Sequence, residues 1–157
     1  MRTRAFVLLG AVGFAALNPP YGVVLAQPPD NAIQAVAGSE KWVPGGPNLA
    51  AGVEMAVLEG DPKQEGLFTM RLRVPKGTHV PPHWHPRDER VTVIAGVVGV
   101  GFGDRHEETG TLFAAGSFYV NPADSHHYLW FPEASVIQIT GEGPWELHAV
   151  PRKKKKK

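Results

Sequence analysis

The sequence from Leu49 onward predicts an all-β domain, built as an antiparallel sandwich or barrel. Three observations support this prediction. Apolar and polar residues alternate along several segments, turn-forming sequences such as Gly60-Asp61-Pro62 recur at short intervals, and no segment after residue 48 shows sustained helical periodicity. The alternation is clearest in segment 66–74, where one face carries Phe68, Met70, Leu72 and Val74 and the other carries Thr69, Arg71 and Arg73.

Further strands follow at regular intervals on both sides of this segment. One strand is expected within residues 50–60, before the first turn. The later strands are expected near residues 83–85, 89–95, 97–103, 111–114, 117–120, 126–131, 135–140 and 145–150. In the strand at 97–103, Gly99, Gly101 and Gly103 alternate and leave one face without side chains. That bare face makes room for a neighbouring strand, a bound molecule or a second subunit.

The N-terminal region predicts a secretory signal peptide that is cleaved near Ala26. Arg2 and Arg4 precede a short apolar run at residues 5–17, which ends at Asn18-Pro19-Pro20. This run is shorter than the roughly 20 residues that span a bilayer. We therefore expect no stable membrane anchor, and we expect export to a bacterial periplasm or secretion.

Composition divides the rest of the chain into three further parts. Residues 27–48 are rich in proline and glycine and predict an extended arm, residues 49–152 form the β-barrel domain, and residues 153–157 are a lysine tail expected to be disordered. Without Arg2, Arg4 and the five terminal lysines, nine basic residues remain against 15 acidic ones, a formal charge of −6. This charge argues against nucleic-acid binding. Cysteine is absent, which excludes disulfide and thiol chemistry.

The segment GTHVPPHWHPRDERVTVIAG, residues 77–96, contains the residues of a candidate metal site. His83 and His85 are one residue apart, so an extended chain points both to the same face, and Glu89 follows four residues later. Imidazole nitrogens and a carboxylate oxygen suit a divalent transition metal, and the candidates are Fe, Mn, Ni, Cu and Zn. His79 precedes His83 by four residues, but Pro81-Pro82 interrupts the strand between them, so His79 is expected at the rim or surface.

The spacing G-x5-H-x-H-x3-E-x6-G resembles the first motif of the cupin superfamily, with matches at Gly77, His83, His85, Glu89 and Gly96. The segment GSFYVNPADSHHYLW, residues 116–130, resembles the second cupin motif, which implies a fourth ligand at His127. Asp124 and Phe131 depart from the family pattern, where glycine and asparagine are usual. Because Asp124 leaves the register open, His126 is the alternative ligand.

The amino-acid sequence of residues 49–150 as a whole is similar to that of small single-domain bacterial cupins of the cupin-2 and ChrR-like type. This resemblance implies a double-stranded β-helix, or jelly-roll barrel, that holds one divalent transition metal near one mouth. It also implies a homodimer, in which the N-terminal arm could be exchanged between subunits. Cupins carry out several unrelated reactions, so the fold does not specify the chemistry.

Strand alternation suggests five residues for a substrate pocket around the metal. They are Phe68, Met70, Tyr128, Trp130 and Gln138. Core packing is the more common role for Phe68 and Met70. Gln138 is the polar member of an apolar strand, so its amide needs a partner, and a metal-bound water or the substrate is one option.

These observations predict an exported metal-binding cupin that acts on a small oxygen-bearing organic molecule. Three imidazoles and a carboxylate leave one or two coordination positions open, which favours a metal-dependent enzyme of the dioxygenase type, an oxidoreductase. A non-redox metal-dependent isomerase or hydrolase is the alternative within the enzymes. A periplasmic module that binds or senses a small ligand or the metal without turnover is the alternative outside them. Nothing else in the sequence identifies a catalytic residue.

Overall fold

The structure is a computed structural model of the chain, and it describes residues 28–105 and 107–151. Two compact units divide the chain, Met1–Ala32 and Ile33–Lys157. All the strands of the described residues lie in the second unit. The predicted signal peptide with its cleavage site, Arg152 and the lysine tail fall outside the described residues.

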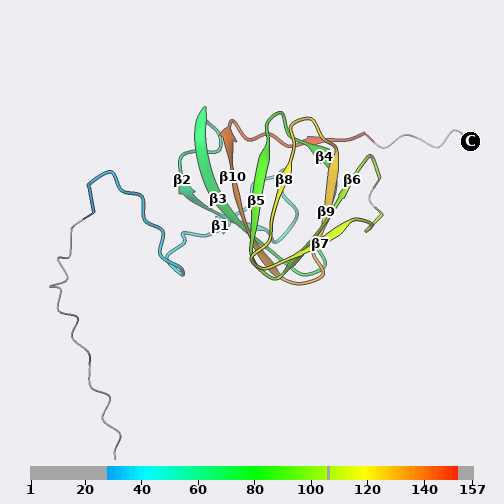
Figure 1. Cartoon of the computed structure of the whole chain (residues 1–157), viewed down its shortest axis with the longest axis horizontal. Coiled ribbons are helices and arrows are strands. Elements are labelled where there is room, and N and C mark those ends of the chain that lie inside the picture. The colour runs from blue at the N-terminus through cyan, green and yellow to red at the C-terminus, as the bar shows by residue number, and fades with distance from the viewer. Residues whose placement is uncertain (1–27, 106, 152–157) are drawn as a thin grey trace, which may run out of the picture. The chain divides into compact units, whose positions relative to one another are not determined.

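The second unit consists of two antiparallel sheets, as Figure 1 shows. The first sheet has the order β1-β2-β3-β10-β5-β8, formed by β1 (Val43–Pro44), β2 (Glu54–Glu59), β3 (Gly66–Val74), β10 (Ser135–Gly143), β5 (Glu89–Ala95) and β8 (Phe118–Asn121). The second sheet has the order β11-β4-β9-β6-β7, formed by β11 (His148–Ala149), β4 (His79–Trp84), β9 (His127–Trp130), β6 (Val97–Phe102) and β7 (Thr111–Ala114). This all-β arrangement confirms the predicted jelly roll.

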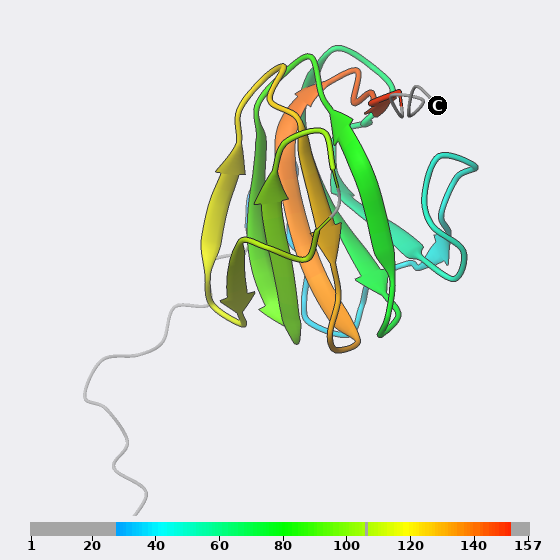
Figure 2. The same ribbon diagram turned by 90° about the vertical axis from the view of Figure 1, so that its right-hand side faces the viewer.

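The hydrophobic core lies between the two sheets, and the strands run side by side around it (Figure 2). Strand β3 contributes every second residue to this core, as its alternation predicts, and β10 pairs with β3 along its whole length. Phe68 and Met70 are fully buried, and Ile139, directly opposite Met70, is 1% exposed. Burial of such side chains contributes roughly 1.5–3 kcal/mol each to folding.

The bare glycine face of β6 accommodates two aromatic rings of the neighbouring strand β9. A Cβ atom at Gly99 would lie 2.0 Å from the ring of Trp130, and one at Gly101 would lie 2.2 Å from the ring of Tyr128. Neither position tolerates a side chain unless the ring moves. Of the three roles that the sequence left open for this face, the structure shows packing against a neighbouring strand.

The segment before the barrel contacts the outer face of the first sheet. Strand β1 pairs with β2, and Glu40 forms an ion pair with Arg71 of β3. The guanidinium of Arg73 lies 4.2 Å from the ring centroid of Trp42. Residues 40–44 of the predicted arm therefore pack on their own domain, and exchange of the arm between subunits stays a prediction.

Strand boundaries differ most from the expected ones at two places. Strand β4 begins at His79, and its pairing with β9 shifts register between Val80 and His83, at the predicted interruption by Pro81 and Pro82. The last expected strand is reduced to the two residues of β11. In the part of the chain that the structure describes, no helix is long and apolar enough to cross a membrane.

Candidate metal centre

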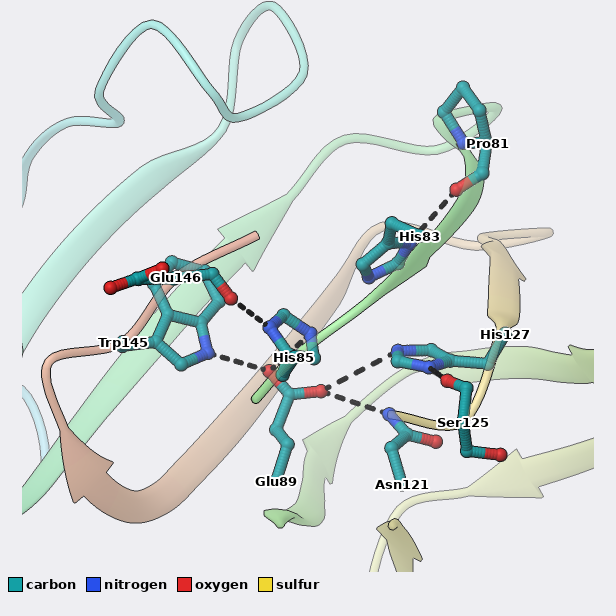
Figure 3. Close-up of polar contacts among 9 residues, drawn as sticks. All are labelled: Pro81, His83, His85, Glu89, Asn121, Ser125, His127, Trp145 and Glu146. Atoms are coloured by element: carbon teal, nitrogen blue, oxygen red, sulfur yellow. Dashed lines mark hydrogen bonds and ion pairs between the residues drawn. The ribbon is translucent and has the colours of Figure 1, made fainter. Parts of the chain in front are cut away.

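Three histidine side chains meet inside the barrel, as Figure 3 shows. His83, near the end of β4, lies directly opposite His127 of β9, and their ring centroids are 4.3 Å apart. His85 follows the end of β4 and points to the same side as His83, with 5.1 Å between the ring centroids. One nitrogen from each residue lies within 4.8 Å of the others, and all three side chains are buried.

Backbone carbonyl groups set the tautomer of each imidazole. The Nδ1 atoms of His83, His85 and His127 lie 2.8, 2.6 and 2.9 Å from the carbonyl oxygens of Pro81, Glu146 and Ser125. Because a carbonyl oxygen only accepts, each Nδ1 must carry the hydrogen and donate it. The lone pair is then on Nε2. The Nε2 atoms of His85 and His127 are buried and have no hydrogen-bond partner among the described residues.

Glu89, the first residue of β5, lies beside these imidazoles. Its Oε1 accepts a hydrogen bond from Nε1 of Trp145 at 3.1 Å, and its Oε2 accepts one from Nδ2 of Asn121 at 2.9 Å. Oε1 is 3.5 Å from Nε2 of His85, and Oε2 is 4.0 Å from Nε2 of His127. The mutually close group comprises the three histidines without Glu89. The carboxylate is thus oriented next to two imidazoles, 5% exposed and held by two donors.

Burial favours the neutral form of His83 and His127 by lowering the pKa of each imidazole. Desolvation, followed by the neighbouring His127, lowers the pKa of His83 from 6.5 to about 4. Desolvation also lowers the pKa of His127, against the opposing effects of the Ser125 carbonyl and Glu89. Neutral imidazole is the form that binds metals, so near pH 7 little proton release opposes binding at these two residues.

The donor set fits a divalent transition metal. Two buried Nε2 atoms that lack partners carry a desolvation cost of roughly 1–3 kcal/mol each unless something binds them. Nδ1–H groups that donate to carbonyls are the usual outer support of metal-binding histidines. Three nitrogens with a carboxylate nearby match Fe, Mn, Ni, Cu or Zn, and the geometry does not select among them.

The turn before β9 decides which of the adjacent histidines faces the site. Asp124 has a left-handed φ of 59° where the cupin pattern has glycine, and its N–H donates to the carbonyl of His85 at 2.8 Å. His127 is fully buried, whereas the side chain of His126 is 39% exposed and lies 2.7 Å from Oδ1 of Asp104. The geometry therefore favours His127 over the alternative ligand His126. Gly77 and Gly96 of the first motif also have positive φ angles.

A small apolar pocket of about 50 Å³ adjoins the histidines. His83 and Glu89 belong to its lining, which is otherwise formed by mainly apolar residues of several strands together with Asn48 and Trp145. No other residue of this lining is titratable. A group bound here would contact two of the proposed metal ligands in an environment that contains little water.

None of the five predicted pocket residues lines this pocket. Phe68 and Met70 are core residues outside the lining of this pocket. Tyr128 and Trp130 point to the opposite face of β9 from His127 and cover the glycines of β6. Gln138 lies on the outer face of β10, where its Oε1 accepts a hydrogen bond from Nε of Arg71 at 3.1 Å. The partner of the Gln138 amide is therefore this arginine, which corrects the suggestion of a water or substrate.

Sequence reasoning missed Asn121 and Trp145, the two residues that orient Glu89. Asn121 is a fully buried polar residue at an inward position of β8, and the expected strand stopped one residue short of it. Trp145 stacks on His85, with 5.5 Å between ring centroids. Its position in a loop before β11 carries no periodic signal that could have revealed this contact.

This combination of a jelly roll with histidines from two hairpins in its interior defines a cupin. The family model of the ChrR cupin-like domain matches residues 31–146, and the chain belongs to this family. A comparison with curated proteins finds no match.

Several solved structures share the fold. The polyketide cyclase RemF from Streptomyces resistomycificus is 15% identical in sequence and matches with a TM-score of 0.60. The match covers 77% of this chain and 87% of the RemF chain. An acetylacetone dioxygenase from Acinetobacter johnsonii is 18% identical and matches with a TM-score of 0.57. The match covers 76% of this chain and 78% of the dioxygenase chain. The anti-sigma factor ChrR of Rhodobacter sphaeroides, solved in complex with SigE, is 21% identical and matches with a TM-score of 0.50. The match covers 69% of this chain and 52% of the matched chain.

Proposed function

We propose that this chain is an exported metal-dependent cupin enzyme that acts on a small oxygen-bearing organic molecule, with dioxygenase chemistry as the favoured reaction. One observation carries the proposal: three buried imidazoles converge, two of them (His85 and His127) with an Nε2 atom that has no hydrogen-bond partner among the described residues, and the third, His83, lines an apolar pocket together with Glu89. A structural metal site is usually closed by its ligands, whereas a pocket beside the ligands is typical of a catalytic site.

The residues of the chain would hold the metal and exclude water from the reaction. His83, His85 and His127 supply nitrogens, and Glu89 is oriented to supply a carboxylate oxygen or to accept a proton from a bound molecule. The bound ion would supply Lewis acidity and, if it is iron, redox chemistry with dioxygen. The pocket of about 50 Å³ limits the part of a substrate next to His83 to a few atoms.

Two measurements test this function in sequence. Elemental analysis of the protein, purified without an affinity metal, identifies the ion. The iron(II)-loaded protein is then assayed for oxygen consumption with acetylacetone, catechol and a small thiol. We expect consumption with at least one compound, loss of it in His127→Ala, and little change in His126→Ala, because the side chain of His126 is itself exposed and paired with Asp104. Metal binding without oxygen consumption across the panel would count against the dioxygenase, and anaerobic turnover with Mn, Ni or Zn would favour the isomerase or hydrolase.

A second candidate function is a module that binds or senses a small ligand without turnover. It is favoured by the lining of the pocket, which holds no titratable residue apart from His83 and Glu89. The fold similarity to ChrR, a protein solved in complex with a sigma factor, makes a signalling role worth testing. Equilibrium dialysis of the metal-loaded protein against the same panel separates the two candidates, because a sensor retains its ligand unchanged whereas an enzyme releases product.

A further inference from the structure

A second pocket, of about 300 Å³, opens between strands β6, β7 and β8. It shares no lining residue with the pocket beside the histidines. Two aromatic rings, Phe102 and Phe113, give it an apolar wall, and Tyr119 of β8 also lines it. Phe102 is 57% exposed, an unusual state for a ring on the inward face of a strand, and its centroid is 6.4 Å from that of His127.

Tyr119 carries a buried hydroxyl group that nothing in the described residues satisfies. The residue is 8% exposed, and its hydroxyl oxygen has no hydrogen-bond partner among these residues. Leaving such a group unpaired costs roughly 1–3 kcal/mol. Tyr128 provides a comparison within the same barrel, because its hydroxyl donates to the carbonyl of Thr109 at 2.7 Å.

A second unsatisfied atom lies on the same face of β8, two residues away. Asn121 must direct its Nδ2 toward Glu89, because a carboxylate only accepts, and its Oδ1 is then left buried without a donor. Two residues along a strand correspond to about 7 Å, and Asn121 is not part of the lining of this pocket. The other buried side-chain atoms that lack partners in the described chain are Nε2 of His85 and His127, which a metal accounts for. The Tyr119 hydroxyl and Asn121 Oδ1 are not explained by a metal.

The ionisation state of Tyr119 makes it a donor. Burial and the negative charge of Glu89 raise its pKa well above the ordinary value of 10. The phenol therefore keeps its proton near neutral pH and offers it to an acceptor.

We propose that the pocket between β6, β7 and β8 binds a small, mainly apolar alcohol or phenol. The hydroxyl of the ligand accepts from Tyr119, and its apolar part packs against Phe102 and Phe113. Solvent does not reach the Tyr119 hydroxyl in this structure, so entry requires a side chain of the lining to move. Phe102, exposed at the rim, is the residue placed to move. This site does not depend on the proposed enzymatic function.

The test uses two molecules of the same shape, 4-methylphenol and 1,4-dimethylbenzene, which differ by a hydroxyl in place of a methyl group. Their affinities for the full chain are measured by NMR titration. Wild type is expected to bind 4-methylphenol about 10-fold more tightly, the value for one typical hydrogen bond. Tyr119→Phe should lose this preference, and Tyr128→Phe should keep it. Absence of binding, or a preference that survives in Tyr119→Phe, would overturn the proposal.

Thermal stability separates a ligand site from a buried structural water. Without ligand, Tyr119→Phe should melt at the same temperature as wild type or higher, because an unpaired hydroxyl is removed, whereas Tyr128→Phe should melt lower. A clear loss of stability in Tyr119→Phe would mean that water or protein already satisfies the hydroxyl, and the proposal would fail. If that variant does not fold, the ring 13C resonance of Tyr119 in wild type decides, since it should shift with 4-methylphenol and much less with 1,4-dimethylbenzene.

Discussion

Two polar clusters of this barrel differ in how completely their hydrogen bonds are satisfied. On the outer face of the first sheet, Arg71 donates to Gln138 and pairs with Glu40, and the hydroxyl groups of Thr69 and Thr140 are 3.2 Å apart. In the interior, the Nε2 atoms of His85 and His127 have no hydrogen-bond partner among the described residues. The outer cluster is complete as it stands, so it serves the fold. The inner cluster pays a cost in stability that a bound group would remove.

The largest effect is expected for a ligand of the inner cluster. His85→Ala removes one of three nitrogens, so zinc affinity should fall by more than roughly 100-fold, the upper end of the effect of residues that only support a ligand. Competition with a chelating dye measures this change. His148→Ala is the control, because that side chain is 40% exposed and paired with Glu146. Equal zinc affinities in the two variants would contradict the assignment of the site.

The stability of the metal-free protein should depend on pH, because burial disfavours the protonated form of His83. The pKa of His83 is about 4 in the folded chain and 6.5 as its ordinary value. Between these values the unfolded chain binds more protons, so the free energy of unfolding should fall as pH drops from 6.5 toward 4, by about 3 kcal/mol from this residue.

Urea unfolding at several pH values measures this dependence. His83→Gln should flatten it between pH 6.5 and 4.5. A slope that His83→Gln does not alter would show that another group is responsible.

A smaller effect is expected for the support of Glu89. Trp145→Phe removes the Nε1–H group that donates to Oε1 but keeps an aromatic ring beside His85. Zinc affinity should fall by about 10-fold, at the lower end of the effect of such outer partners. If the affinity is unchanged, Glu89 does not contribute to metal binding through this oxygen.

The smallest effect is expected in the outer cluster. Gln138→Leu removes the acceptor of Arg71 Nε and should lower the free energy of unfolding by about 1 kcal/mol, with no change in zinc affinity. Urea unfolding and the chelator assay measure the two quantities. A loss of metal binding in this variant would mean that the two clusters are coupled through β10.

The sequence alone was sufficient for the fold and for the candidate ligands. Period-two alternation predicted strands such as β3 because the sheet buries one face, and the cupin spacing selected His83, His85, Glu89 and His127. These are local signals, since residues within one motif are held at fixed distances by the chain itself.

Only the tertiary structure decided which of the remaining residues meet the site. The cupin spacing favoured His127 but left His126 as the alternative, because a turn with one left-handed residue, Asp124, precedes β9. The sequence placed Tyr128, Trp130 and Gln138 near the metal, although each lies on an outward face, and it missed Asn121 and Trp145. Which face of a strand is inward, and which strands face each other, depend on pairing between segments far apart in the chain, and no local pattern records that pairing.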